Sequence, residues 1–148
     1  MVKICHASIS ENGTINGQRG DQTKKEVCER DWYNKPWKYC IRFIDPDMRD
    51  RCAFAMERAA VNDRWGYSQT DRNSGLVEAR KVGYDPGLVS KAVNTDCSAL
   101  VTVACIYAGI AEEALVKSGN SATTSTLKDR LKATGASNIS PRSSLSVF

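Results

Sequence analysis

The feature that most constrains the fold is an apolar run that begins at Cys97 and ends at Gly109, directly after Asp96. Apolar side chains fall on nearly every side of the helix that this run predicts, so the helix is expected to be buried. A polar residue before such a run and a glycine after it are typical helix boundaries. The sequence therefore predicts a buried helix over 97–108, around which the remaining elements pack.

This pattern places Cys97 at the helix N-terminus. Unpaired backbone N–H groups and the positive end of the helix dipole stabilise an anion there, and the thiolate is the nucleophilic form of cysteine. A buried helix also holds its first residue rigidly, which a catalytic nucleophile requires. The alternative is that Cys97 is simply a small apolar residue of the core, as many free cysteines are.

Length and composition bound the class of protein. A chain of 148 residues, 41% hydrophobic and 26% charged, is expected to form one globular domain. No stretch approaches the ~18 apolar residues that a membrane span needs, so no membrane association is expected. The first six residues, Met1 to His6, lack the apolar core of a secretory signal. The protein is therefore expected in the cytoplasm of the producing cell, to be released by some other device.

Six cysteines and a single histidine are present, without any Cys-x-x-Cys pair. This set supplies too few ligands for the usual zinc patterns, so neither a metal site nor another cofactor is predicted. Reduced thiols are favoured, with disulfides as the alternative. The net charge of +4 is spread among acidic residues, which argues against nucleic acid and is compatible with an anionic surface such as a bacterial wall. A monomer is expected.

Periodicity and turn residues predict a segregated α+β domain, with strands mostly in the first third. A hairpin is expected to join residues 2–9 to 14–15 through a turn at 11–13, because Asn12-Gly13 is a turn signal. Further strands are expected over 26–33 and 39–44. Asp45 and Pro46 are expected to cap and open a helix over 47–62. Further helical segments are expected over 68–82, from Asp85 and over 123–133.

A cysteine nucleophile needs a base, and His6 is the only imidazole in the sequence. His6 lies on a predicted strand far ahead of Cys97. The two side chains can meet only if the strands pack against the N-terminus of the buried helix. The alternative is that His6 is structural or simply exposed, as most single histidines are.

Several short motifs follow one another along the chain: His6-Ala7-Ser8, Gly20-Asp21-Gln22-Thr23, Trp32-Tyr33-Asn34-Lys35-Pro36-Trp37, Gly66-Tyr67, Arg72-Asn73 and the run from Thr95 to Val101. Taken in this order, they resemble the NlpC-type and CHAP-type cell-wall cysteine peptidases of the papain-like superfamily, and in particular the catalytic domain of phage endolysins. The resemblance extends from His6 to Gly135. It departs from most NlpC-type enzymes because the histidine precedes the cysteine, as in a circularly permuted relative. Lys24 also stands where similar lysins tend to have glycine.

The resemblance implies a papain-like α+β fold, in which an antiparallel sheet packs on the buried helix that carries the nucleophile. Residues 1–139 would form a catalytic domain that acts on peptidoglycan, and 140–148 a tail or last strand. Cys97 would attack an amide carbonyl of the stem peptide, while His6 would hold the thiolate as an ion pair and later protonate the leaving amine. Asp21 would orient His6. Gln22 is the alternative third member, and a surface-turn aspartate is the alternative for Asp21.

The resemblance also implies an oxyanion site made by the Cys97 backbone N–H and the Tyr67 side chain. Asp96 and Ser98 flank the nucleophile and are expected to belong to the oxyanion or substrate site. Trp37 is expected to form a wall of the substrate groove, with core packing as the alternative.

Two other functions stay open. One is a papain-like enzyme that acts on protein, such as a toxin or an isopeptidase, and the other is a catalytically inactive wall-binding module of the same fold. For a wall hydrolase, either an endopeptidase or an amidase fits the same nucleophile.

Overall fold

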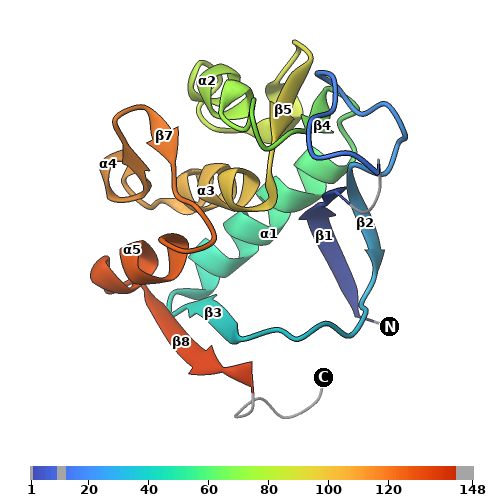
Figure 1. The fold of residues 1–148 in the computed structure, drawn as a ribbon. Helices are drawn as coiled ribbons and strands as arrows, with labels where there is room; N and C mark the ends of the chain where they lie inside the picture. The colour runs from blue at the N-terminus through green and yellow to red at the C-terminus, as the bar shows by residue number, and fades with distance from the viewer. Residues whose placement is uncertain (1, 10–12, 143–148) are drawn as a thin grey trace.

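Two long helices, α1 (Pro46–Ala60) and α3 (Cys97–Ala108), pack against each other at the centre of the fold (Figure 1). The structure is a computed structural model that describes residues 2–9 and 13–142. α3 has the predicted boundaries, and α1 starts where predicted but ends two residues before the predicted end at 62. The Asp45 carboxylate accepts the Asp47 N–H at 2.9 Å ahead of Pro46, and Gly109 ends α3 with a φ of 120°.

The strands are short, and in the described part of the chain they form four two-stranded sheets rather than one. Three pairs are antiparallel and the β4–β5 pair is parallel. The α+β class is confirmed, but the single antiparallel sheet is wrong. With two to five residues each, the strands are covered mainly by the helices rather than by further strands. Their bounds are β1 (Lys3–Ala7), β2 (Val27–Asp31), β3 (Tyr39–Phe43), β4 (Trp65–Tyr67), β5 (Val93–Thr95), β6 (Val116–Lys117), β7 (Asn120–Ser121) and β8 (Ser137–Pro141).

The predicted N-terminal hairpin is wrong. β1 pairs with β2, so that His6 lies opposite Cys28, whereas Asn16 forms an isolated bridge to Ser68. The β1–β2 pairing buries Ala7 and Val27 together in the core, a gain that the exposed residues 14–15 cannot supply. The predicted turn falls largely on residues 10–12, which lie outside the described residues.

The shorter helical segments with bounds inside the described residues are α2 (Ser74–Arg80), the 3-10 helix η2 (Pro86–Leu88), α4 (Glu112–Leu115) and α5 (Leu127–Ala133). The predicted segments at 68–82 and 123–133 therefore begin later than expected. Polar side chains explain the delay, because they bind nearby backbone in place of the helical ladder. The Ser68 hydroxyl accepts the Asp71 N–H at 3.1 Å, and the Thr126 hydroxyl accepts the Thr123 N–H at 2.9 Å.

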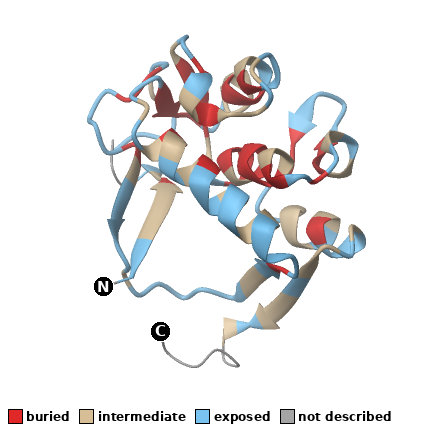
Figure 2. Ribbon diagram, turned by 180° about the vertical axis from the view of Figure 1, so that it is seen from behind, coloured by how far each residue is buried: buried red, intermediate tan, exposed pale blue. Residues whose placement is uncertain are grey.

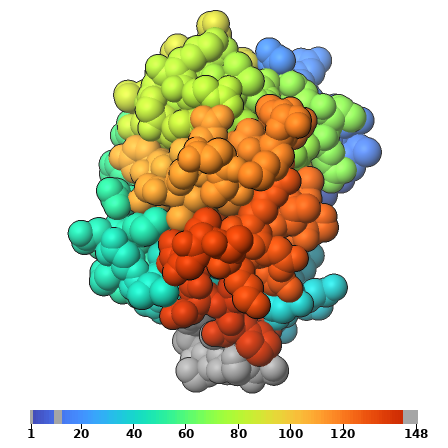
Figure 3. All heavy atoms as spheres, turned by 90° about the vertical axis from the view of Figure 1, so that its left-hand side faces the viewer, coloured from blue at the N-terminus to red at the C-terminus, as the bar shows by residue number. Residues whose placement is uncertain are grey.

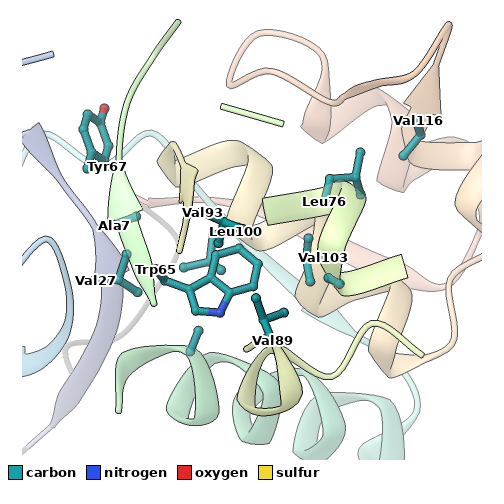
Figure 4. Packing of buried hydrophobic residues seen from close by; sticks show 12 residues of the cluster. Ala7, Val27, Trp65, Tyr67, Leu76, Val89, Val93, Leu100, Val103 and Val116 are labelled. Carbon is teal, nitrogen blue, oxygen red and sulfur yellow. The ribbon is translucent and has the colours of Figure 1, made fainter. Parts of the chain in front are cut away.

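The main core gathers around the fully buried Trp65 of β4, whose indole N–H donates to the Pro86 carbonyl at 2.9 Å (Figure 4). Leu100 and Val103 of α3 pack into the same cluster. A second cluster, centred on Leu115 and Leu131, joins α3 to α4 and α5. Burial is concentrated on α3 and on the elements beside it (Figure 2), as predicted for the apolar run.

The prediction of a tail or a last strand over 140–148 falls mostly on residues outside the described part of the chain, and it stays a prediction. β8 spans 137–141 and pairs with β3, while residues 143–148 lie outside the described part. α5 and β8 cover one face of the molecule below α2 and α4 (Figure 3). Among the described residues, no helix is long and apolar enough to cross a membrane.

Candidate functional site

Cys97 is the first residue of α3 and has an exposed side chain, although most of the helix behind it is buried. Strand β5 ends at Thr95 and delivers the chain directly to this helix start. The Cys97 Sγ atom lies 3.9 Å from the hydroxyl of Thr124. The structure therefore places an accessible thiol at the helix N-terminus, where the backbone favours an anion.

A groove of about 890 Å³ opens beside Cys97. One wall is the segment that enters β3, with Trp37 and Tyr39, and the other is the segment 124–129 that begins α5. Apolar side chains in the lining include Pro36, Trp37, Ile41, Val101 and Leu127. This volume is large enough for a small ligand or a short peptide segment. Trp37 is 36% exposed and lies on this wall, rather than in the core.

Two lysines add positive charge to the same groove. Lys38 lies beside Trp37, and Lys128 places its Nζ atom 4.6 Å from the centroid of the Tyr39 ring. The Lys128 Nζ atom is also 3.7 Å from a carboxylate oxygen of Asp129. Asp129 lines the groove as well, so the groove combines aromatic and aliphatic surface with two lysines and one acid.

Tyr67 is brought next to Cys97 by the parallel pairing of β4 with β5, in which Tyr67 lies opposite Thr95. Its side chain is 4% exposed, and its hydroxyl accepts a hydrogen bond from the Gln69 amide at 3.2 Å. Burial raises the pKa of Tyr67, and the charges of Cys97 and Asp96 raise it further, against the Gln69 hydrogen bond. Tyr67 thus keeps its proton beside the thiol. Figure 4 shows its hydroxyl pointing away from the other labelled core side chains.

Asp96 caps α3, as its Oδ1 atom accepts the Ala99 N–H at 2.7 Å. The same carboxylate is held by Arg72, with Nε 2.6 Å from Oδ2 and Nη2 3.2 Å from Oδ1. Ser98 is buried and donates to Asp96 Oδ1 at 3.0 Å. Asp96 and Ser98 therefore fix the helix start on which Cys97 stands.

His6 lies on β1, and its Nε2 atom is 3.5 Å from the Cys28 sulfur on β2. Its ring meets the Tyr33 ring edge-on at 6.1 Å, and Tyr33 lies 6.0 Å from Trp37, ring centroid to centroid. Because Trp37 lines the groove that Cys97 also lines, this aromatic series connects the imidazole to the groove. The thiol in direct contact with the imidazole is that of Cys28.

Asp21 is nearly buried, and both of its carboxylate oxygens accept backbone N–H groups. Oδ1 accepts from Thr23 and Lys25, both at 3.1 Å, and Oδ2 accepts from Glu26 at 3.1 Å and Val27 at 3.3 Å. The carboxylate thereby shapes the chain that leads into β2. The neighbouring Gln22 is exposed and donates to the Gly20 carbonyl at 3.0 Å.

The loop that carries Asp21 docks directly on the strand that carries Tyr67. The Gly20 N–H donates to the Val93 carbonyl at 3.0 Å, and a Cβ atom at Gly66 would lie only 2.3 Å from the Gly20 carbonyl oxygen. Only glycine at position 66 allows this approach. The motifs at 20–23 and 66–67 are therefore in contact in the fold.

Glu26 is a buried acid that the sequence analysis missed. Its side chain is 1% exposed, and its Oε2 atom accepts the Tyr67 backbone N–H at 3.1 Å. It thus ties the start of β2 to β4, close to the proposed oxyanion residue. A single glutamate at the edge of a strand pattern gives no sequence signal for this role.

The other cysteines differ from Cys97 in their surroundings, and all six are free thiols in the structure. Burial raises the pKa of Cys5 to about 11, with a further contribution from nearby acids. The pKa of Cys105 is also raised, by a hydrogen bond with Cys52 and by deep burial. Within the described residues, no group of three or more His, Cys, Asp or Glu side chains is arranged to hold a metal ion.

The structure is thus an α+β domain with an exposed thiol at the start of its most buried helix, beside a groove. A family model described as endolysin-like domain matches residues 4–144. The chain belongs to this endolysin-like family, which indicates a phage cell-wall lytic role. Comparison with curated proteins and with solved structures gave no match.

Proposed function

We propose that this protein is a peptidoglycan hydrolase that cleaves an amide bond of the wall stem peptide, with Cys97 as nucleophile. The observation that carries the proposal is the exposed Cys97 thiol at the N-terminus of buried α3, on the wall of the groove. Membership of the endolysin-like family supports the wall as target. The papain-like architecture and action as a monomer, after release from the producing cell, are parts of the same proposal.

The chemistry follows from the thiol. The Cys97 thiolate attacks the carbonyl carbon, the C–N bond breaks, and the leaving amine takes a proton from the His6 imidazolium. Neutral His6 then takes a proton from the water that attacks the thioester, and cleavage of the C–S bond releases the acid and regenerates the pair of Cys97 thiolate and His6 imidazolium. The Cys97 backbone N–H and the protonated Tyr67 hydroxyl stabilise the oxyanion of both steps.

The groove chemistry fits a stem peptide. A short peptide that carries carboxylates would find aromatic and aliphatic surface at Trp37 and Leu127 and cationic groups at Lys38 and Lys128. The same groove could accept an acidic segment of a protein, so the target class is decided by assay. Zymography on purified sacculi from several bacteria, with mass spectrometry of the released fragments, identifies both the target and the bond cut.

A second candidate nucleophile is Cys28, because its sulfur is the one that lies 3.5 Å from His6 Nε2. Cys28 is half-buried on a strand, without the helix N-terminus that favours the Cys97 thiolate. The Cys97 mechanism requires the His6 side chain to change its conformation when substrate binds. The imidazole then loses its contact with Cys28 and turns toward the groove, on the side of Tyr33 and Trp37. Catalytic contacts are often completed only in the substrate complex.

The test compares Cys97→Ala with the matched variant Cys28→Ala, alongside His6→Ala, in hydrolysis of purified sacculi. The proposal expects Cys97→Ala to abolish hydrolysis, His6→Ala to lower the rate by on the order of 10²- to 10⁴-fold, and Cys28→Ala to keep most of it. Loss of activity in Cys28→Ala with retention in Cys97→Ala would move the nucleophile to β2. Retention of hydrolysis in both cysteine variants would exclude the thiol mechanism.

A further inference from the structure

Arg72 joins three segments that are far apart in the sequence, just behind the nucleophile. Besides its two contacts with Asp96, its Nη2 atom lies 3.0 Å from the Ser98 hydroxyl and 2.7 Å from the Ala122 carbonyl. Nη1 donates to the Ser121 carbonyl at 3.2 Å. The side chains of Arg72 and Asp96 are each only 14% exposed. Every edge of the guanidinium is therefore engaged.

The segment 121–122 leads directly to the residues 124–129 that line the groove together with Cys97. Asn73 adds a second anchor there, since its Oδ1 atom accepts both the N–H of Ser121 at 3.0 Å and its hydroxyl at 2.6 Å. Two residues further along, Thr124 carries the hydroxyl that lies 3.9 Å from the Cys97 sulfur. Arg72 thus holds both the helix start that bears the thiol and the end of β7, from which the chain leads to Thr124.

The charge of Arg72 matters as well as its geometry. The Asp96 carboxylate immediately precedes Cys97, and a negative charge at this position opposes ionisation of the thiol. The bidentate contact with Arg72 compensates that charge while leaving Asp96 free to cap the helix. Without Arg72, the carboxylate would be uncompensated in a largely buried place.

From this arrangement we propose that Arg72 is a positioning residue that fixes the groove wall against Cys97 and keeps the Cys97 thiol ionisable. Its role in turnover rests on the proposed function, whereas its effect on the thiol does not. Arg72 does not line the groove, so it acts through Asp96 and through the segment 121–124.

The experiment measures the rate of alkylation by iodoacetamide at Cys97 as a function of pH, read by peptide mass spectrometry. We expect Arg72→Gln to move the midpoint of the profile upward and to slow labelling at neutral pH by about three- to tenfold. Arg72→Lys keeps the positive charge but loses the bidentate contact of the guanidinium with Asp96. The pH midpoint of alkylation should therefore shift less than in Arg72→Gln. In hydrolysis of sacculi, both variants should lower kcat with little change in KM.

Controls separate this role from plain stability. Arg80→Gln removes an arginine from the exposed ion pair with Glu112 and should leave the profile unchanged. Asn73→Ala removes the second anchor without a charge change, so it should lower the thermal midpoint but not move the pH midpoint. In the double variant Arg72→Gln with Asp96→Asn the uncompensated charge is gone, and the pH midpoint should return toward that of the parent.

An unchanged pH midpoint in folded Arg72→Gln would overturn the proposal. Should Arg72→Gln not fold, an unchanged midpoint and kcat in Arg72→Lys would overturn it equally. The alkylation result is independent of wall hydrolysis. Full hydrolysis by Cys97→Ala would therefore refute the proposed function, while the effect of Arg72 on the Cys97 thiol would still be measured.

Discussion

Substitution of Asp21 by asparagine separates a structural role of this residue from the role that the resemblance implies. The carboxylate accepts four backbone N–H groups between Thr23 and Val27. The carbonyl oxygen of asparagine can accept two of them. The other two donors would then face the asparagine NH₂ group, which is itself a donor.

The expected cost follows from burial. Glu26 and Val27 are 1% and 3% exposed, so their N–H groups could not turn to water if the bond to Asp21 were lost. A hydrogen bond to a charged group contributes about 1.5–3 kcal/mol, and an unsatisfied buried donor costs a similar amount. Allowing for relaxation of the loop, we expect Asp21→Asn to lower the free energy of unfolding by about 3 kcal/mol.

Urea unfolding followed by tryptophan fluorescence measures this loss. For a urea dependence of about 2 kcal/mol per M, the midpoint should fall by about 1.5 M with an unchanged slope. The matched control is Asp63→Asn, an exposed acid that pairs with Lys24 next to the same loop, and its effect should stay below about 0.5 kcal/mol. An unchanged midpoint in Asp21→Asn, together with slower hydrolysis and an altered pH profile, would refute the structural reasoning and favour a direct action on His6.

Two further predictions concern Tyr67 and Cys5. Tyr67→Phe should lower kcat for wall hydrolysis by about 10²-fold with little change in KM, because it removes one oxyanion donor; an unchanged kcat would exclude this role. The raised pKa of Cys5, about 11, means that the folded chain holds this proton more tightly than the unfolded chain does. The contribution of this proton to the free energy of unfolding is complete below about pH 9 and is lost as the pH rises through about 11. Cys5→Ala should therefore reduce the alkaline loss of stability by up to ~2 kcal/mol, as measured by urea unfolding at each pH. Equal pH dependence in both proteins would contradict it.

The elements that could be predicted are those whose boundaries are set by their own residues. Asp45 with Pro46 starts α1, and Asp96 with Gly109 frames α3, because capping is a local interaction. The partner of β1 could not be predicted in this way. The choice of β2 over residues 14–15 depends on burying Ala7 with Val27 beneath α1 and α3, which is a contact between distant segments.

The same distinction, between local patterns and contacts of distant segments, applies to the candidate site. The place of Cys97 at a helix start follows from the local pattern, whereas its exposure does not, because the pattern left burial in the core open. The roles predicted for Cys97, Tyr67, His6 and Asp21 stay predictions. Arg72 appeared only as part of a motif, since its purpose depends on Asp96 and on carbonyls about fifty positions further along the chain.

The placement of an exposed thiol on the most buried helix has a physical reason. α3 is covered along its length by α1, by β1 and by the elements that follow it, so its axis cannot shift without disturbing both core clusters. Its N-terminal part lines the groove through Cys97, Ser98 and Val101. At the helix start, the backbone N–H of Cys97 has no partner within the helical hydrogen-bond ladder. That N–H and the thiol can both face a carbonyl group in the groove. Rigidity thus comes from the buried body of α3, and reactivity from its open end.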